Sequence, residues 1–262
     1  MIIDFHTHYY PDKIVDRAMD NARKALKADP FTDGTRAGLL ESMRNAGIDY
    51  SVALPLANTA DNVRGVNRWA QINNESPIFV LGSIHPRTAN PVEMISRIAA
   101  MGLKGIKMHP EFQDFSFEDE SLFPIWEACM ENDLFVLTHA GGDVSFSAPY
   151  RSDPRSLKDF HKKFKKLKLV LAHLGSWGMW DEVEKFLVGL PVYLDLAFTL
   201  GKMPDEQLVR IIRGHGAERV LFGTDSPWCD QKEAVEYFHT LPLTDKEKSL
   251  ILGLNAAELL QI

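Results

Sequence analysis

Short apolar runs alternate with amphipathic stretches along almost the whole chain. Eight of these runs are rich in residues that favour strands, and each is followed by a longer stretch with apolar residues at helical spacing. The runs cover residues 2–8, 50–54, 78–85, 105–109, 134–139, 169–173, 192–198 and 220–225. Strands that alternate with helices are typical of parallel βα units. Eight such units predict an α/β fold of the closed (β/α)8 TIM-barrel type.

The stretches between the runs carry the start and stop signals of helices. Gly47 ends one of them, Pro91 opens another, and Asp153 precedes a third as its cap. The connection over residues 9–33 is long for a link between a strand and a helix, and its pattern is helical between residues 14 and 26. We therefore expect a helical insertion after the first strand, which could cover the mouth of the barrel as a lid.

Length, composition and charge narrow the class of protein. The chain has 262 residues, 45% of them hydrophobic, and we expect a single domain over residues 1–262. A formal net charge of -7 argues against a nucleic-acid partner, because phosphates are neutralised by a basic face. Asp4 and His6 interrupt the first apolar run, so we expect neither a signal peptide nor a membrane span, and we expect a cytoplasmic protein. Cys129 and Cys229 have no partner spacing and are expected to be free thiols.

Residue types that bind metals or move protons fall at the ends of the predicted strands. In barrels of this kind, chemistry takes place at the C-terminal ends of the strands. The residues at these ends are His6, His8, His85, Lys107, His109, His139, His173 and Asp225. His6 and His8 share one face of the first strand, about 7 Å apart, because successive side chains point to opposite faces. Two imidazoles at that spacing can bind one metal ion.

Alternation along the strands indicates that these polar groups converge. In the fifth, sixth and eighth strands, apolar residues share a face with the polar residue at the end, as expected for a packed floor below a polar mouth. A lone histidine at a strand end is more often a hydrogen-bonded core residue, and a lone aspartate often caps a helix. Several strand ends with the same pattern are harder to explain in that way. Three imidazoles and one carboxylate suit Zn²⁺, and Mn²⁺, Fe²⁺ and Co²⁺ accept the same ligands.

Five short motifs resemble those of the amidohydrolase superfamily. The resemblance is to its amidohydrolase-related branch, amidohydrolase 2, which includes TIM-barrel enzymes similar to aminocarboxymuconate semialdehyde decarboxylase. The motifs are His-Thr-His at 6–8, Gly-Ile-Lys-Met-His-Pro at 105–110, Thr-His-Ala-Gly at 138–141, Ala-His-Leu-Gly at 172–175 and Gly-Thr-Asp-Ser-Pro at 223–227. Residues 251–260 are similar to the final helix of that branch, so the resemblance covers nearly the whole chain.

The resemblance implies a metal site and a catalytic pair. The residues that would hold a divalent metal are His6, His8, His139 and Asp225. Asp225 and His173 would be the catalytic residues. Lys107 leaves two alternatives open, because some superfamily members carry a carboxylated lysine at the end of strand four that bridges two metals. The branch resembled here more often works with one metal, so we expect one divalent ion, zinc.

Such a site predicts a metal-dependent hydrolase. A metal held by histidines and an aspartate lowers the pKa of bound water to about 7 and supplies hydroxide at neutral pH. The hydroxide would attack the carbonyl of an amide, a lactone or a related bond. Asp225 would accept the proton of the water, and His173 would stabilise the oxyanion or orient the nucleophile. The alternative is a decarboxylase or lyase of the same branch, which acts on an unsaturated or aromatic carboxylic acid and adds a proton to carbon.

The expected partner is a small polar or carboxylated substrate. The residues predicted to bind it are Lys107, His109, Tyr150 and Arg151. Arginine can hold a carboxylate through two hydrogen bonds. The alternative interpretation is that Arg151 and the nearby Arg155 are surface residues at the start of a helix. No motif indicates the oligomeric state, although barrels of this type often form homodimers.

Two further classes are less well supported. A barrel deoxyribonuclease resembles this chain at His6 and His8 but typically has a glutamate at the end of strand four, where this chain has Lys107. A non-catalytic barrel that binds a metal for structural purposes is the other. Structural zinc sites are usually closed and lack a spare acid or base, so the predicted set favours an enzyme.

Overall fold

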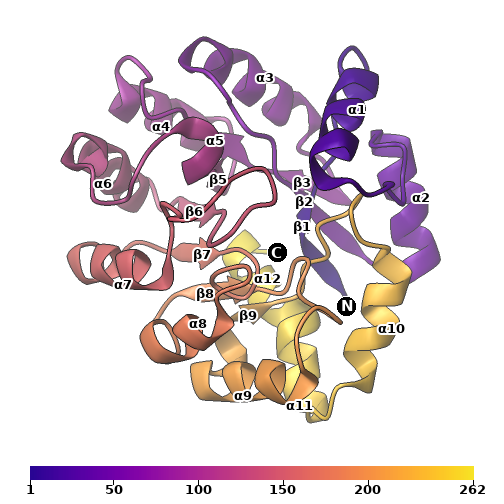
Figure 1. Cartoon of the computed structure of the whole chain (residues 1–262). Helices are drawn as coiled ribbons and strands as arrows, with labels where there is room; N and C mark the ends of the chain where they lie inside the picture. The colour runs from indigo at the N-terminus through magenta and orange to yellow at the C-terminus, as the bar shows by residue number, and fades with distance from the viewer. The chain divides into compact units, whose positions relative to one another are not determined.

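The computed structural model describes residues 1–262, in which strands and helices alternate from the N-terminus to the C-terminus (Figure 1). The chain forms two compact units. The first unit contains Met1–Leu54, Ser76–Phe79 and Asp195–Ile262, and the second contains Pro55–Glu75 and Val80–Leu194. The expectation of one domain over the whole chain stays a prediction.

All eight predicted strands form, and the third of them is divided in two. The run at residues 78–85 gives β3 (Ile78–Val80) and β4 (Gly82–Ser83). A side chain at Gly82 would meet Cγ2 of Ile98 at 2.7 Å, so the strand can pass this point only without a Cβ.

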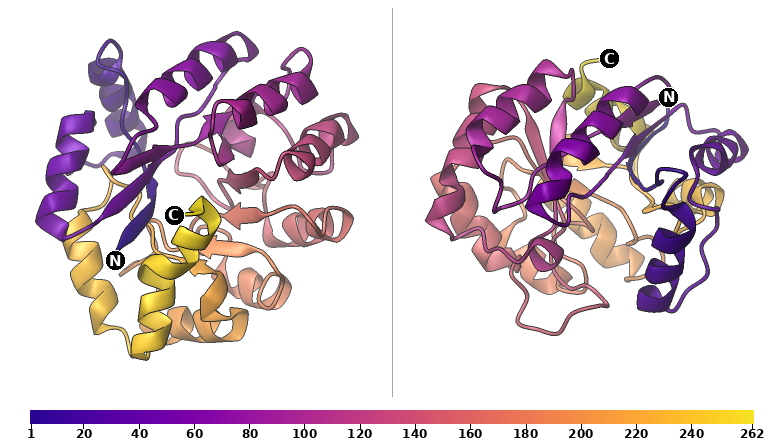
Figure 2. Two further views of the ribbon diagram at one scale, coloured as in Figure 1. Left: turned by 180° about the vertical axis from the view of Figure 1, so that it is seen from behind. Right: turned by 90° about the horizontal axis from the view of Figure 1, so that it is seen from above.

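The first unit is built around β1, which pairs in parallel with β2. On its other side, the backbone N–H of Phe5 donates to the carbonyl of Phe222 over 2.8 Å. Figure 2 shows α2 beside α10, and the two helices are in contact. The elements of this unit are β1 (Ile3–Thr7), α1 (Val15–Leu26), α2 (Arg36–Ala46), β2 (Tyr50–Ala53), α9 (Asp205–His215), η3 (Ala217–Arg219), β9 (Val220–Leu221), α10 (Gln231–Thr240), α11 (Asp245–Ser249), the π-helical η4 (Leu250–Leu254) and α12 (Asn255–Leu260).

The second unit contains a parallel sheet in which β4, β5, β6, β7 and β8 are neighbours in that order. β5, β6 and β7 are buried along their whole length, as expected for parallel strands covered by helices. Two strands have residues in both units, β3 and β8 (Tyr193–Asp195). The other elements of this unit are η1 (Ala60–Asn62), α3 (Val63–Asn73), α4 (Pro91–Ala100), β5 (Gly105–Met108), α5 (Pro110–Gln113), η2 (Glu120–Leu122), α6 (Phe123–Glu131), β6 (Phe135–Thr138), α7 (Pro154–Lys163), β7 (Leu169–Leu171) and α8 (Trp180–Phe186).

The predicted helix boundaries are confirmed. α1 is the helical insertion expected after the first strand. α2 ends at Gly47, whose φ of 68° lies in the left-handed region that favours glycine. α4 begins at Pro91, and the side chain of Asp153 caps α7 by accepting hydrogen bonds from two backbone N–H groups. No helix has both the length and the apolar character that crossing a bilayer demands.

Candidate metal centre and histidine cluster

Three of the predicted ligands lie together in the first unit. His6 is on β1, His8 follows it, and Asp225 lies shortly after β9. The Nε2 atom of His8 is 3.1 Å from Oδ1 of Asp225, and the Nε2 atom of His6 is 3.5 Å from the same oxygen. One ligand atom from each residue lies within 4.8 Å of those of the other two. The strand-end pattern therefore identified three side chains that could hold one ion.

Backbone hydrogen bonds hold these side chains in position. The N–H of Asp225 donates to the carbonyl of His6 over 2.8 Å, and the N–H of His8 donates to the carbonyl of Ser226 over 2.6 Å. Asp225 has a φ of 70°, a left-handed conformation that is uncommon outside glycine. Such conformations are retained where the surrounding structure fixes them, and they are frequent at functional sites.

The hydrogen bonds of the two imidazoles define which ring nitrogens carry protons. Nδ1 of His6 lies 2.8 Å from Oδ2 of the buried Asp195, and Nδ1 of His8 lies 3.3 Å from the carbonyl oxygen of Leu54. A carboxylate and a carbonyl only accept, so in both neutral rings the proton is on Nδ1. Both Nε2 atoms face the carboxylate oxygen of Asp225, to which a proton on Nε2 of His8 would donate. A divalent metal in the place of such a proton fits the same three ligand atoms.

Asp195 is a partner that the sequence pattern did not identify. It is fully buried and bonds to Nδ1 of His6, the arrangement in which carboxylates orient metal-bound histidines. We expect Asp195→Ala to weaken the affinity for Mn²⁺ or Zn²⁺ by about 10- to 100-fold, measured by competition with a chelator. The control is Asp205→Ala, which removes an exposed carboxylate from α9 of the same unit. Equal metal affinity in the two variants would contradict this role.

The other predicted ligand, His139, lies in the second unit within a cluster of histidines. Its Nδ1 is 3.1 Å from Nε2 of His173, and its Nε2 is 3.0 Å from the carbonyl oxygen of Gly142. The ring of His109 stacks on that of His139, with centroids 4.1 Å apart and an interplanar angle of 12°. Asp143 approaches His109, with Oδ2 3.5 Å from Nε2. His109, His139 and Asp143 form a second group whose ligand atoms lie within 4.8 Å.

Burial favours the neutral form of two members of this cluster, His139 and His109. Burial holds the pKa of His139 well below its usual range, and the nearby His109, His173 and Lys107 lower it further. Burial also lowers the pKa of His109 to about 4, although the hydrogen bond to Asp143 acts in the opposite direction. Neutral imidazoles can bind metals or exchange hydrogen bonds, but they do not supply positive charge for an anionic substrate. The predicted role of His109 in substrate binding would therefore be hydrogen bonding.

The pKa of His109 predicts a loss of stability in mild acid. The folded protein keeps this ring neutral down to about pH 4, whereas the ring in the unfolded chain takes up a proton near pH 6.5. The stabilisation is therefore complete above pH 6.5 and is lost as the pH falls through about 4, by about 3 kcal/mol from His109 alone. Urea unfolding of the wild type and of His109→Gln between pH 7 and pH 4 measures the difference. Equal pH dependence in the two proteins would contradict the assignment.

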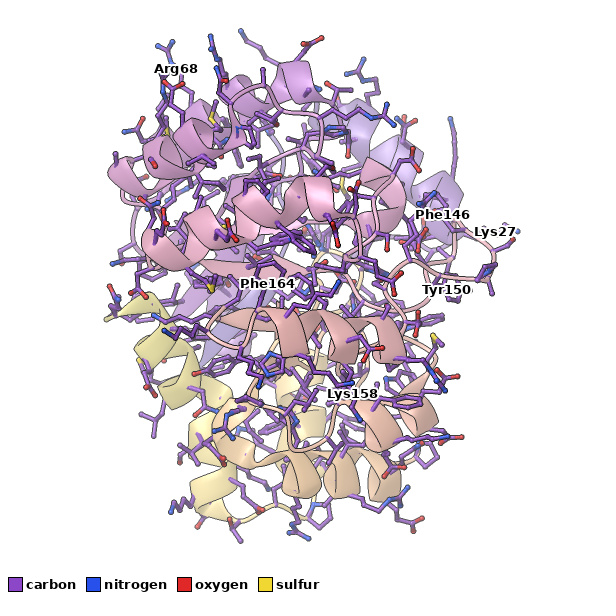
Figure 3. All side chains as sticks on the ribbon, turned by 90° about the vertical axis from the view of Figure 1, so that its left-hand side faces the viewer. Lys27, Arg68, Phe146, Tyr150, Lys158 and Phe164 are labelled. Atoms are coloured by element: carbon purple, nitrogen blue, oxygen red, sulfur yellow. The ribbon has the colours of Figure 1, made fainter.

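Lys107, Tyr150 and Arg151, the other residues predicted to bind substrate, also lie in the second unit. Lys107 is on β5 and is buried. Tyr150 and Arg151 are on the loop between β6 and α7, which also carries Phe146 (Figure 3 labels Tyr150 and Phe146). The Arg151 guanidinium pairs with Asp114, with Nη2 2.6 Å from Oδ1. Its backbone N–H donates to Oε1 of Glu111 over 2.6 Å, so Arg151 ties this loop to α5.

Comparison with protein-family models identifies the family to which this chain belongs. The family model described as amidohydrolase matches residues 3–262. The chain belongs to the amidohydrolase family. This confirms the resemblance inferred from the five motifs. No curated protein matches the chain.

Solved structures with a similar fold confirm the α/β TIM-barrel architecture of this chain. An uncharacterized TIM-barrel protein from Bordetella bronchiseptica is 23% identical, with a TM-score of 0.83 over 99% of this chain and 98% of its own. 5-Carboxyvanillate decarboxylase from Sphingomonas paucimobilis is 17% identical, with a TM-score of 0.77 over 100% and 99%. Dihydroxybenzoic acid decarboxylase from Polaromonas sp. JS666, with bound manganese and the inhibitor 2-nitroresorcinol, is 15% identical, with a TM-score of 0.72 over 99% and 96%.

Proposed function

We propose that this protein is a metal-dependent decarboxylase of a small aromatic or unsaturated carboxylic acid. The observation that carries the proposal is the convergence of two imidazole nitrogens and a carboxylate oxygen from His6, His8 and Asp225. Hydrolysis was the activity expected from the sequence. Several solved structures with a similar fold are decarboxylases, and this similarity supports carbon dioxide release instead. They also make Mn²⁺ the first metal to test beside Zn²⁺.

In the proposed reaction, the bond between the carboxyl group and its carbon breaks, and carbon dioxide leaves. The electron pair stays on that carbon, which takes up one proton. A divalent metal, when bound, supplies a Lewis acid that holds and polarises substrate oxygens. Asp225 is proposed to hold the proton that reaches the carbon. Its side chain is 16% exposed, so its carboxylate is accessible from solvent while Oδ1 faces the two histidines.

The histidine cluster has two proposed roles. His139 is proposed as the fourth metal ligand, which requires one of its ring nitrogens to release its present partner, Gly142 or His173. His173 is proposed to hold a substrate oxygen through its ring N–H. Lys107, Tyr150 and Arg151 remain proposed contacts for the substrate carboxylate. Metal affinity of His139→Asn distinguishes a ligand from a hydrogen-bonded core residue, since only loss of a ligand lowers the affinity.

Hydrolysis is the second candidate function, and the full-length match to an amidohydrolase family model favours it. A panel of hydroxybenzoic acids, unsaturated dicarboxylic acids, lactones and amides distinguishes the two with the Mn²⁺-loaded and the Zn²⁺-loaded protein. We expect release of carbon dioxide from at least one aromatic or unsaturated acid. Turnover of a lactone or amide, without carbon dioxide release from any acid, would contradict the decarboxylase assignment and support the hydrolase.

A further inference from the structure

Asp4 is a buried carboxylate that the proposed chemistry does not use. It lies on β1, is fully buried, and accepts four hydrogen bonds. Oδ1 accepts from the backbone N–H groups of His6, over 3.2 Å, and of Thr224, over 2.9 Å. Oδ2 accepts from Oγ1 of Thr224, over 2.6 Å, and from Nε2 of Gln231, over 2.7 Å. Each carboxylate oxygen therefore has two donors.

The donors lie on the segments that carry the metal-binding side chains. His6 is itself one of the three residues, and Thr224 directly precedes Asp225. The pairing of β1 with β2 is irregular between Asp4 and Thr7, which is the interval that contains His6. The bond from the His6 N–H to Asp4 supports the backbone within this irregular interval.

Thr224 extends this support to Asp225. Its hydroxyl donates to Asp4 and accepts from the N–H of Ser226 over 3.0 Å. The two neighbours of Asp225 in the chain, Thr224 and Ser226, are therefore bonded to each other, and Asp225 has its left-handed conformation between them. Local strain of this kind persists only where neighbouring contacts hold it. Asp4 holds Thr224 in place by accepting from its backbone N–H and its hydroxyl.

We infer that Asp4 is a positioning residue for the metal centre, because its carboxylate joins the backbone of His6 to that of Thr224 and so fixes the separation of the His6 and Asp225 side chains. This inference rests on the metal site of the proposed function. It assigns a role to a residue that is not among the proposed ligands of the ion or the proposed contacts of the substrate. A fully buried carboxylate with only neutral donors is costly compared with an apolar residue. The bonds to the ligand-bearing segments account for its presence here.

The test compares three ways of breaking this network. Thr224→Val has the same shape and removes the hydroxyl, whereas Asp4→Ala removes the whole anchor. Gln231→Ala is the matched control, since it removes a bond from Asp4 to α10 and leaves both ligand-bearing segments bonded to the carboxylate. Asp4→Asn is the conservative variant, because its amide oxygen can still accept from the N–H groups of His6 and Thr224.

We expect Thr224→Val and Asp4→Ala to weaken Mn²⁺ binding by at least about 10-fold in chelator competition, the effect of losing an outer-shell partner. The visible absorption of the Co²⁺-loaded proteins should change in the same variants, since it reports ligand geometry. Gln231→Ala should lower the Tm and keep Mn²⁺ affinity and the Co²⁺ spectrum. Asp4→Asn keeps the two backbone bonds and loses the hydroxyl bond, so it should fall between the wild type and Asp4→Ala in both readouts. If Asp4→Ala does not fold, the Thr224→Val and Gln231→Ala pair decides.

Two results would overturn the inference, and they are distinct from failure of the proposed function. Unchanged Mn²⁺ affinity in Thr224→Val and Asp4→Ala would assign Asp4 to the core alone. The same conclusion would follow if Gln231→Ala lost as much Mn²⁺ affinity, for a given loss of Tm, as Thr224→Val and Asp4→Ala do. Absence of Mn²⁺ binding by the wild type would overturn the proposed function and this inference together, whereas absence of carbon dioxide release with normal binding would overturn only the decarboxylase assignment.

Discussion

Replacing Asp225 with asparagine is expected to lower turnover by about 10²- to 10⁴-fold, the typical contribution of a positioned acid or base. The amide has the same shape as the carboxylate but no charge, and its nitrogen cannot hold a metal or accept a proton. Oδ1 of Asp225 is the atom that faces the Nε2 atoms of both His6 and His8, so the change acts at the point where the three side chains converge.

Asp230→Asn provides the matched control for this substitution. Asp230 caps α10 by accepting from the N–H of Glu233 over 2.9 Å, and asparagine is an equally good cap. Both variants should give the circular dichroism spectrum of the wild type, and only the variant at 225 should lose activity towards the acid identified in the substrate panel. Wild-type turnover in Asp225→Asn would exclude this carboxylate from the chemistry.

Removal of the metal is expected to abolish activity and to lower the Tm by about 5 °C or more. A ligand present at 100 times its Kd stabilises a protein by about 2.7 kcal/mol, and each kcal/mol shifts the Tm of a protein of this size by about 2–4 °C. Without the ion, the lone pairs of His6 and His8 face the Asp225 carboxylate, and one of these groups must take up a proton or move apart. Differential scanning calorimetry of the chelated and the Mn²⁺-loaded protein measures the shift.

His8→Ala is the control for metal removal. This variant lacks one of the three converging groups, so the chelator should change its Tm by much less than it changes that of the wild type. Addition of Mn²⁺ should restore the Tm and the activity of the chelated wild type. A Tm and turnover that survive exhaustive chelation would show that no metal is needed.

The strands and the main features of the fold were predictable because each depends on local sequence. Strand-forming runs, the glycine that ends α2 and the Asp153 cap of α7 all act over a few residues, and the structure confirms them. The break between β3 and β4 was not predicted, and neither was the approach of Ile98, on the helix that follows, which leaves no room for a Cβ at Gly82. A strand pattern does not reveal which residues are forced to be small by packing.

The residues of the candidate site also fall into two groups, those that the sequence predicted and those that it did not. His6, His8 and Asp225 were among the polar residues at predicted strand ends, and the resemblance to the amidohydrolase-related branch selected them as metal ligands. Asp195 and Asp4 were not identified, since their partners lie 189 and 220 residues away in the chain. A carboxylate within an apolar run was the only signal that either gave.

Two loop residues show why the second unit was harder to interpret. Asp143 follows two glycines in a loop and gave no pattern at all, although it approaches His109. Arg151 stays a proposed contact of a substrate carboxylate, and its ion pair with Asp114, which lies 37 residues earlier in the chain, gave no signal in the sequence. Ion pairs between loops depend on the tertiary fold and leave no periodic signal.

The most direct test of the metal centre is the anomalous scattering of crystals grown with one equivalent of Zn²⁺ or Mn²⁺. The account predicts one peak about 2 Å from Nε2 of His6, Nε2 of His8 and the carboxylate of Asp225. A peak held only by His109, His139 and Asp143, or no peak within reach of His6 and His8, would contradict it.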